Sequence, residues 1–224
     1  MNIAVFDFCE TLVNFQSADR FIDFVIQGRI GYFQKFISVI TWISKRLRFL
    51  PLIHYLFPEY NIYKRLHLLK IRGVEKDFIF QKANDYLNEV INYNTNSELL
   101  QKLRQHKTEG DMVIISSGGL SPYLMLFSEQ EKVDVLFCSE IEFLNGRATG
   151  FLKGPDCMLG NKVRLLEFYL KSNPEIKFEE KFVYSDSITD LPLLSWGDNS
   201  FVISYNEKQN WVEKYNFQEI ILSR

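Results

Sequence analysis

The sequence predicts an α/β fold, in which a parallel β-sheet with helices on both faces carries a separate all-helical lobe. Three observations support this prediction. Short apolar runs alternate with segments of helical periodicity over much of the 224 residues. Residues 14–95 place apolar side chains at steps of three and four throughout. Polar turns that contain carboxylates follow the ends of apolar runs, as expected where parallel strands end at a ligand site.

The first predicted strand is the apolar run at residues 3–6, and helices are expected at residues 99–110 and 163–169. Strands alternating with helices imply right-handed crossovers between parallel strands. Residues 141–151 predict a hairpin beside this sheet, because the Asn-Gly pair at 145–146 favours a type I′ turn. The other strands that we expect are at residues 112–115, 133–137, 182–184, 200–204 and 219–222.

The helical periodicity of residues 14–95 predicts a lobe inserted into the sheet domain. Pro51, Pro58 and Gly73 interrupt the pattern, and residues 78–92 indicate a further helix. We therefore expect a sheet core formed by residues 1–13 and 96–224, and a helical lobe formed by residues 14–95.

Residues 31–57 are unusually aromatic and apolar. Basic side chains interrupt this segment, and its uncharged runs of about ten residues are shorter than the roughly 18–20 that a transmembrane helix needs. We expect no transmembrane segment. Helices packed within the lobe explain the composition, and so does a helix face that rests on a membrane or on an apolar substrate tail. The periodicity leaves this choice, including peripheral membrane contact, open.

Composition excludes several classes of protein. A formal net charge of -2, without long charged runs, gives no bulk attraction to nucleic acid, so no nucleic-acid partner is expected. Three cysteines without a CxxC spacing favour neither a disulfide framework nor a zinc site. No basic and apolar leader is evident before the first strand, and a cytoplasmic location is expected.

Polar residues lie at or near the ends of predicted elements in four places. Asp7 follows the first strand, Ser116 and Ser117 follow the second, and Lys162 lies near the start of a helix. Asp186 and Asp190 follow a later strand, spaced one helical turn apart in a way that suits a hard cation. Each feature alone also has an ordinary explanation as a turn, a cap or a surface side chain. Their joint order is the informative observation.

Taken in that order, four motifs resemble the haloacid dehalogenase superfamily, and within it the phosphoserine-phosphatase-like branch. They are residues 7–13 (DFCETLV), 113–119 (VIISSGG), 157–163 (CMLGNKV) and 184–194 (YSDSITDLPLL). The resemblance covers nearly the whole chain outside the helical lobe. It implies a Rossmann-like core with a helical cap inserted just after the first motif, which agrees with the lobe expected from periodicity.

The resemblance also implies a function: a Mg²⁺-dependent phosphatase that hydrolyses a small-molecule phosphate monoester through an aspartyl-phosphate on Asp7. Mg²⁺ would be held by the carboxylates of Asp7 and Asp186, the backbone carbonyl of Cys9 and water, with Asp190 behind them or bound through water. Phosphate would be bound by Thr11, Ser117, Gly118 and Lys162. Ser117 is favoured over Ser116, which stays open.

Cys9 departs from the family pattern, because its position usually carries the second acid that protonates the leaving group. A thiol is a poor substitute in general acid–base catalysis. Three interpretations remain. The substrates have good leaving groups, such as acyl or aryl phosphates; a cap residue such as His54 or His67 supplies the proton; or the chain is a catalytically impaired relative that binds a phosphate ligand. Cys9 is kept as a candidate catalytic residue.

The expected substrate also departs from phosphoserine. Gln16 stands where phosphoserine phosphatases carry an acidic residue that holds the substrate's ammonium group, and Glu10 replaces the usual small residue beside the catalytic turn. Glu10 is either a further charge near the pocket mouth or a solvated surface side chain. The aromatic lobe favours an aromatic, lipid-like (apolar) or sugar-linked leaving group.

Overall fold

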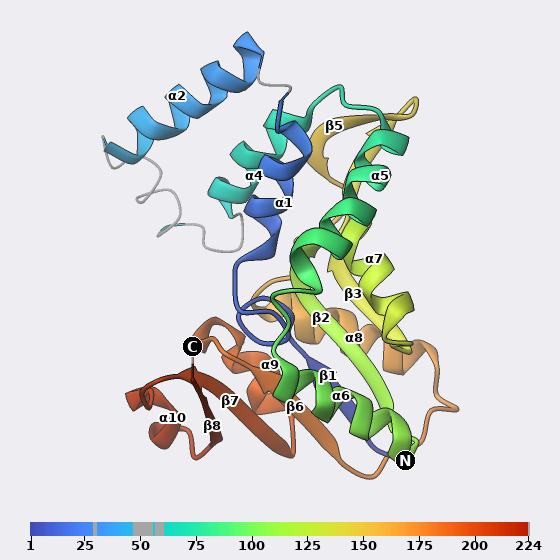
Figure 1. The fold of residues 1–224 in the computed structure, drawn as a ribbon. Coiled ribbons are helices and arrows are strands. Elements are labelled where there is room, and N and C mark those ends of the chain that lie inside the picture. The colour runs from blue at the N-terminus through green and yellow to red at the C-terminus, as the bar shows by residue number, and fades with distance from the viewer. Residues whose placement is uncertain (29–30, 47–55, 57–60, 224) are drawn as a thin grey trace.

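A computed structural model describes residues 1–28, 31–46, 56 and 61–223 (Figure 1). Its centre is a six-stranded sheet in the order β3-β2-β1-β6-β7-β8, and every neighbouring pair is parallel. This confirms the predicted parallel sheet. The strands are β1 (Ile3–Phe6), β2 (Met112–Leu120), β3 (Val135–Ser139), β6 (Lys181–Ser185), β7 (Asn199–Tyr205) and β8 (Gln218–Leu222).

Side chains of the central strands alternate between two buried clusters, because successive residues of a strand point to opposite faces. Ala4 and Phe6 lie in one cluster with residues of α6 and α7, whereas Ile3 and Val5 lie in the other with residues of α8, α9 and α10. Helices therefore cover both faces, as predicted. These helices are α6 (Ser97–Glu109), α7 (Ser121–Gln130), α8 (Gly160–Ser172), α9 (Leu191–Trp196) and α10 (Asn210–Lys214).

The elements that the structure describes between residues 14 and 95 are all helical, and Figure 1 places most of them beyond one end of the sheet. Gly73 separates two of them at a φ of +80°, whereas Pro51 and Pro58 lie outside the described residues. None of the described helices is long and apolar enough to span a bilayer. The elements are α1 (Ser17–Ile26), α2 (Tyr32–Arg46), α4 (Ile62–Leu68), η2 (Leu69–Ile71), α5 (Lys76–Tyr86) and the π-helical η3 (Leu87–Ile91).

The hairpin has the expected turn but not the expected neighbour. β4 (Ile141–Leu144) and β5 (Arg147–Leu152) form a separate antiparallel sheet, and Asn145 and Gly146 have the positive φ that a type I′ turn requires. The hairpin packs on the helical segment rather than beside the main sheet. Backbone N–H groups of Gly73 and Ala148 donate across this contact to Ala148 and Val74, at 2.8 and 2.9 Å. Backbone pairing between segments distant in sequence thus decided its position.

β2 also differs from the prediction, which ended this strand at residue 115 and placed a loop at 116–119. The strand continues to Leu120, and its pairing with β3 shifts register between Ser116 and Leu120. A residue with a Cβ would not fit at position 119, because the Cβ would lie 2.6 Å from Leu124 Cδ1 and 2.7 Å from Tyr123 Oη. Glycine avoids both contacts. Gly118 and Gly119 therefore allow close packing within an irregular strand.

Candidate active site

A cavity of about 220 Å³ opens at the carboxyl ends of β1, β2 and β6. Asp7, Ser117 and Asp186 line it from the ends of these strands, and Lys162 lines it from the first turn of α8. Residues of α1 and α4 form the opposite wall. This is the edge at which open α/β sheets usually bind ligands.

A buried ion-pair network lies at the floor of the cavity. Lys162 Nζ donates to Asp7 Oδ1 at 2.7 Å and to Asp190 Oδ2 at 2.6 Å, and Ser185 Oγ donates to the same Asp190 oxygen at 2.6 Å. All three charged side chains are at most 7% exposed. One ammonium group thus joins residues that lie far apart in the sequence.

Burial shifts the ionisation of this network. Loss of solvent raises the pKa of Asp7 to about 6, even though the neighbouring Lys162 charge opposes the rise. For Lys162 burial acts in the opposite direction, but the carboxylates of Asp190 and Asp7 outweigh it and raise the pKa of the ammonium. Lys162 therefore stays protonated at neutral pH, while Asp7 is mostly ionised.

Asp186 adds a third carboxylate to the same cavity. Its burial, together with the negative charges of Asp7 and Asp190, raises its pKa to about 8. Thr11 Oγ1 donates to Asp186 Oδ1 at 3.4 Å, and Thr11 itself is fully buried. Thr11 is not among the residues that line the cavity. The structure thus places the Thr11 hydroxyl against the Asp186 carboxylate, and the phosphate contact expected for Thr11 stays a prediction.

Ser117 and Ser116 point to different surroundings, as alternate residues of a strand do. Ser117 lines the cavity, and its Oγ accepts from the backbone N–H of Gly119 at 3.1 Å. Ser116 Oγ instead lies 3.7 Å from the Cys157 thiol, away from the cavity. Gly118 also lines the cavity, and a Cβ there would lie 2.7 Å from Met158 Cγ.

Cys9 lies in a chain of buried hydroxyl groups. Its Sγ is 3.0 Å from Ser17 Oγ, which in turn is 2.6 Å from Tyr123 Oη. Tyr86 Oη donates to the backbone carbonyl of Ser17 at 3.0 Å. Burial and the nearby charge of Asp7 raise the pKa of Cys9 to about 11, so the group remains a neutral thiol at physiological pH.

The structure describes one of the two histidines, His54 and His67, that were expected as possible replacements for the missing acid. His67 Nε2 lies 3.0 Å from Asp23 Oδ1 and 3.0 Å from Lys70 Nζ, and His67 does not line the cavity. His67 is therefore poorly placed to protonate a leaving group. His54 lies outside the described residues.

Gln16 and Glu10, the two positions that depart from the phosphoserine phosphatase pattern, lie differently with respect to the cavity. Gln16 lines it, at the residue before α1. Glu10 does not, and its backbone carbonyl accepts from Tyr205 Oη at 2.9 Å. Glu10 also adopts a φ of +55°, so it turns the chain directly after β1.

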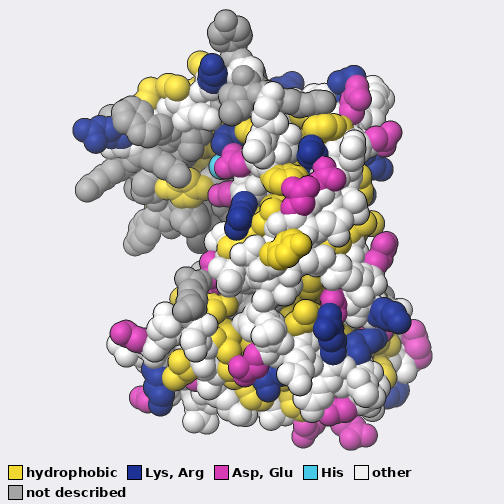
Figure 2. Space-filling view, viewed as in Figure 1, with side chains coloured by type: hydrophobic (Ala, Val, Ile, Leu, Met, Phe, Trp, Pro, Cys, Tyr) yellow, Lys and Arg dark blue, Asp and Glu magenta, His cyan; other side chains and the backbone are white. Residues whose placement is uncertain are grey.

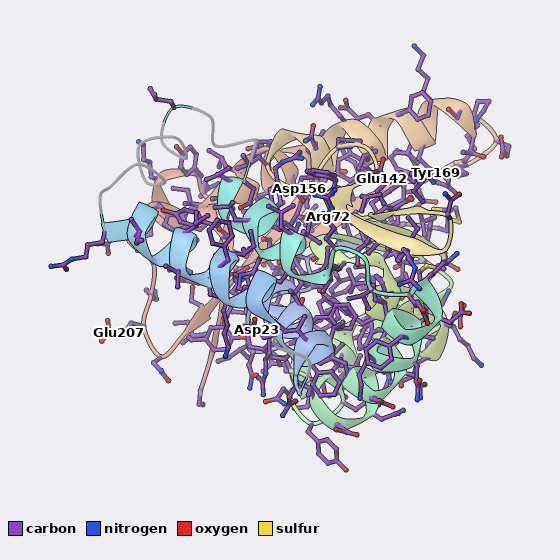
Figure 3. All side chains as sticks on the ribbon, turned by 90° about the horizontal axis from the view of Figure 1, so that it is seen from above. Asp23, Arg72, Glu142, Asp156, Tyr169 and Glu207 are labelled. Atoms are coloured by element: carbon purple, nitrogen blue, oxygen red, sulfur yellow. The ribbon has the colours of Figure 1, made fainter. Side chains whose placement is uncertain are left out.

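A second buried lysine, Lys64 of α4, lines the cavity and was not found by sequence reasoning. Lys64 Nζ donates to Asp156 Oδ1 at 2.6 Å, to Ser139 Oγ at 3.0 Å and to the backbone carbonyl of Gly118. Figure 3 labels Asp156 among the side chains close to α4. No motif marks Lys64, because its partners come from segments distant in the sequence.

The donor set suits a hard divalent cation. Asp7, Asp186 and Asp190 bring three carboxylates to a cavity where Lys162 is the ammonium paired with two of them. Lys64 does not balance the remaining charge, because it is paired with Asp156. Oxygen donors with excess negative charge are the ligands that Mg²⁺ prefers. Burial, and after it the charges of Asp7 and Asp190, raises the pKa of Asp186, which a bound cation would oppose.

Comparison with known families now defines the class of protein. The model of the haloacid dehalogenase-like hydrolases matches residues 4–195. The chain therefore belongs to this family of hydrolases, as the four motifs predicted. Among proteins with curated descriptions, none matches this sequence.

Solved structures share the fold over nearly the whole chain. A protein of unknown function from Bordetella pertussis Tohama I has a TM-score of 0.76 at 20% identity, covering 98% of this chain and 97% of that one. A phospho-aspartyl intermediate analogue of phosphoserine phosphatase has a TM-score of 0.63 at 17% identity, covering 98% and 92%. Cytosolic 5'-nucleotidase IIIB bound to cytidine has a TM-score of 0.67 at 16% identity, covering 99% and 80%. The expected likeness to phosphoserine phosphatases is confirmed at the level of fold, and the expected enzyme class, a phosphoric monoester hydrolase, agrees with these comparisons.

Proposed function

We propose that this protein is a Mg²⁺-dependent phosphatase that transfers the phosphoryl group of a small-molecule monoester to Asp7 and then to water. The observation that carries the proposal is the position of Asp7, buried at the end of β1 and held 2.7 Å from Lys162 Nζ at the floor of the cavity. Family membership and the fold shared with a phosphoserine phosphatase support it.

In the first step, an Asp7 carboxylate oxygen attacks phosphorus, and the bond from phosphorus to the ester oxygen breaks. The leaving oxygen departs as an anion and takes up one proton from water. In the second step, water attacks phosphorus, the bond to Asp7 breaks, and inorganic phosphate leaves. Lys162 and Ser117 bind phosphate oxygens, and the Lys162 ammonium stabilises their charge in the transition state.

Asp7, Asp186 and the backbone carbonyl of Cys9 would hold Mg²⁺, with Asp190 positioned behind them through its bond to Lys162. Bound Mg²⁺ offsets the repulsion between the anionic nucleophile and an anionic phosphate ester. The protein's own contribution is to keep Asp7 ionised and oriented through Lys162, whose charge opposes the effect of burial on the pKa of Asp7.

Protonation of the leaving group is the weak point of this site. The Cys9 thiol is hydrogen-bonded to Ser17 and has a pKa of about 11, which makes it a poor acid for an alkoxide leaving group. We therefore propose substrates whose leaving groups need little help, such as aryl or acyl phosphates. The alternative function is a catalytically impaired protein that binds a phosphate ligand.

The helices of residues 14–95 are proposed to act as a cap that selects the leaving group. Gln16, Asn61, Tyr63 and Lys64 of this segment line the cavity opposite Asp7. Gln16 stands where phosphoserine phosphatases carry an acidic residue, so a phosphoserine-like ammonium group is not expected at that position; the acidic side chain of this wall is Asp19 of α1. The proposed leaving group is apolar or sugar-linked. The proposed location is the cytoplasm, which agrees with the three free cysteines.

The test measures phosphate release from an aryl phosphate and from an alkyl phosphate, with Mg²⁺ and with EDTA. The native chain should release phosphate from the aryl ester only with Mg²⁺, and Asp7→Asn should abolish this release. Cys9→Asp should speed up hydrolysis of the alkyl ester by about 10²-fold or more, since general acid catalysis contributes about 10²–10⁴-fold. The aryl ester should gain much less.

Asp77→Asn serves as the matched control, because Asp77 is an exposed carboxylate on α5 that lies outside the cavity. It should leave both rates unchanged. Absence of Asp7-dependent turnover in the native chain, combined with tight binding of phosphate, would establish the binding function instead. Activity that appears only in Cys9→Asp would identify the thiol as the lesion.

A further inference from the structure

Helix α2 has apolar side chains on two sides. Ile37 is buried where the helix contacts η2 and α4. On another side Phe36, Val39, Ile40 and Ile43 are 59%, 53%, 36% and 43% exposed. Their spacing of three, four and seven residues places these four side chains in one stripe along the helix. We call these four residues the α2 stripe.

Helix α5, in the same helical segment, shows the usual arrangement. Its exposed side chains are Lys76, Asp77, Gln81 and Asn84, all of them polar, while Ile79, Ala83 and Tyr86 are buried. A surface helix normally turns its polar face to solvent in this way. The α2 stripe reverses that rule, so packing within the described part of the chain does not explain it.

Basic side chains accompany the stripe. Lys35 and Arg46 are exposed, and helical geometry puts both on the same flank of the stripe. In Figure 2 hydrophobic side chains over α2 lie between dark-blue basic ones. The sequence from 29 to 58 contains no Asp or Glu, although the whole chain has a net charge of -2, and its basic residues are Arg29, Lys35, Lys45, Arg46 and Arg48.

Two other occupants fit the stripe less well. No described residue of α2 lines the cavity, so the stripe is not the binding site for a substrate tail. A second copy of this chain would bring the stripe against itself, because two-fold contacts pair identical surfaces. Such a contact would set the Lys35 and Arg46 flanks near each other. A stable dimer also needs about 800 Å² from each partner, or about 20–30 residues, far more than one stripe.

We infer that the α2 stripe and its basic flank dock this protein on an anionic lipid bilayer. An apolar helix face bordered by Lys and Arg lies in the plane of the membrane interface, with the apolar side chains among the acyl chains and the basic ones near lipid phosphates. The chain would rest on the membrane surface without spanning it. The inference does not rest on the proposed phosphatase activity.

Sedimentation with phosphatidylcholine vesicles, with and without phosphatidylglycerol, tests this. The native chain should sediment with the anionic vesicles and much less with neutral ones. The triple variant Phe36→Ser, Ile40→Ser and Ile43→Ser should lower the partition coefficient by about tenfold or more. The double variant Lys35→Gln, Arg46→Gln should lower the partition coefficient by about fivefold for each charge removed. High salt should also lower the partition coefficient of the native chain.

Phe168→Ser is the matched control, because Phe168 on α8 is 72% exposed and lies outside the stripe. It should bind vesicles like the native chain. Circular dichroism and thermal unfolding should show that all variants fold, since the changed side chains are exposed. The charge variant gives a second test if the triple variant misfolds. Equal binding to neutral and anionic vesicles, no binding to either, or a dimer that the triple variant dissociates would each overturn the inference.

Discussion

The two buried lysines beside the cavity differ in how their charge is balanced. Lys64 faces one carboxylate, Asp156, and completes its contacts with a hydroxyl and a backbone carbonyl. Lys162 faces two carboxylates, Asp7 and Asp190. Burial and the charges of these two groups raise the pKa of a third carboxyl, that of Asp186. The first network is neutral as it stands. The second carries excess negative charge.

This difference separates a structural contact from a reactive one. A balanced pair such as Lys64 and Asp156 connects α4 to the core and leaves no charge for a ligand, although Asp156 Oδ2 has no hydrogen-bond partner among the described residues. A cluster with excess negative charge is costly to bury unless a cation compensates it. The Lys162 network therefore marks the ligand site, and the Lys64 network fixes the wall opposite it.

Replacing Lys162 should have the largest effect. Lys162→Met leaves Asp7 and Asp190 without their shared partner, so we expect a loss of stability of about 3–5 kcal/mol in metal-free protein. The turnover number should also fall by about 10²–10³-fold, as when a preorganised transition-state donor is lost. Urea unfolding and phosphate release measure the two effects.

Lys171→Met, an exposed lysine on the same helix α8, controls for the loss of a lysine and should change neither quantity. Added Mg²⁺ should restore part of the stability of Lys162→Met by compensating the carboxylates. Native-like turnover in Lys162→Met would contradict the role of this lysine at the phosphoryl group.

Replacing Lys64 should act mainly on stability. Lys64→Met leaves Asp156 buried without a counter-charge, which costs about 3–5 kcal/mol, and Mg²⁺ should not restore it. Asp156→Asn in the same chain should recover part of the loss, with a coupling energy of about 0.5–3 kcal/mol in a double-mutant cycle. Urea unfolding of the four proteins gives this energy. Additive losses would mean that the two side chains do not act as a pair.

The pH dependence of stability should show a clear sign. The pKa values of Asp7 and Asp186 are raised to about 6 and about 8, so the folded state binds more protons than the unfolded state above about pH 4. The stabilising contribution is complete below that pH and is lost as pH rises through 6 and then 8. The Tm of metal-free protein should therefore fall between about pH 5 and pH 8.5.

Asp186→Asn removes the group with the higher pKa, and Mg²⁺ favours its ionised form. Either change should reduce the fall in Tm over the upper part of this range. Thermal unfolding in EDTA and in Mg²⁺ makes the comparison. A Tm that rises with pH in EDTA, or that is indifferent to Asp186→Asn, would show that these carboxylates are not uncompensated in the folded protein.

Sequence by itself determined the parallel sheet, the places where β1 and β6 end, and the order of the reactive residues. These features are local: a short apolar run fixes a strand, and the polar residues after it must lie where the strand ends. Asp7, Ser117 and Asp186 could therefore be assigned to one edge of the sheet. Lys162 could be added only because its motif resembled that of a known family.

Only the tertiary structure decided the rest, because it depends on contacts between segments distant in the sequence. Lys64 and Asp156 are 92 residues apart, and nothing around either one predicts their pairing. The hairpin's place on the helical segment, the hydroxyl chain beside Cys9 and the exposed stripe of α2 have the same origin. Periodicity shows that a helix has an apolar face, but packing alone decides whether that face is covered.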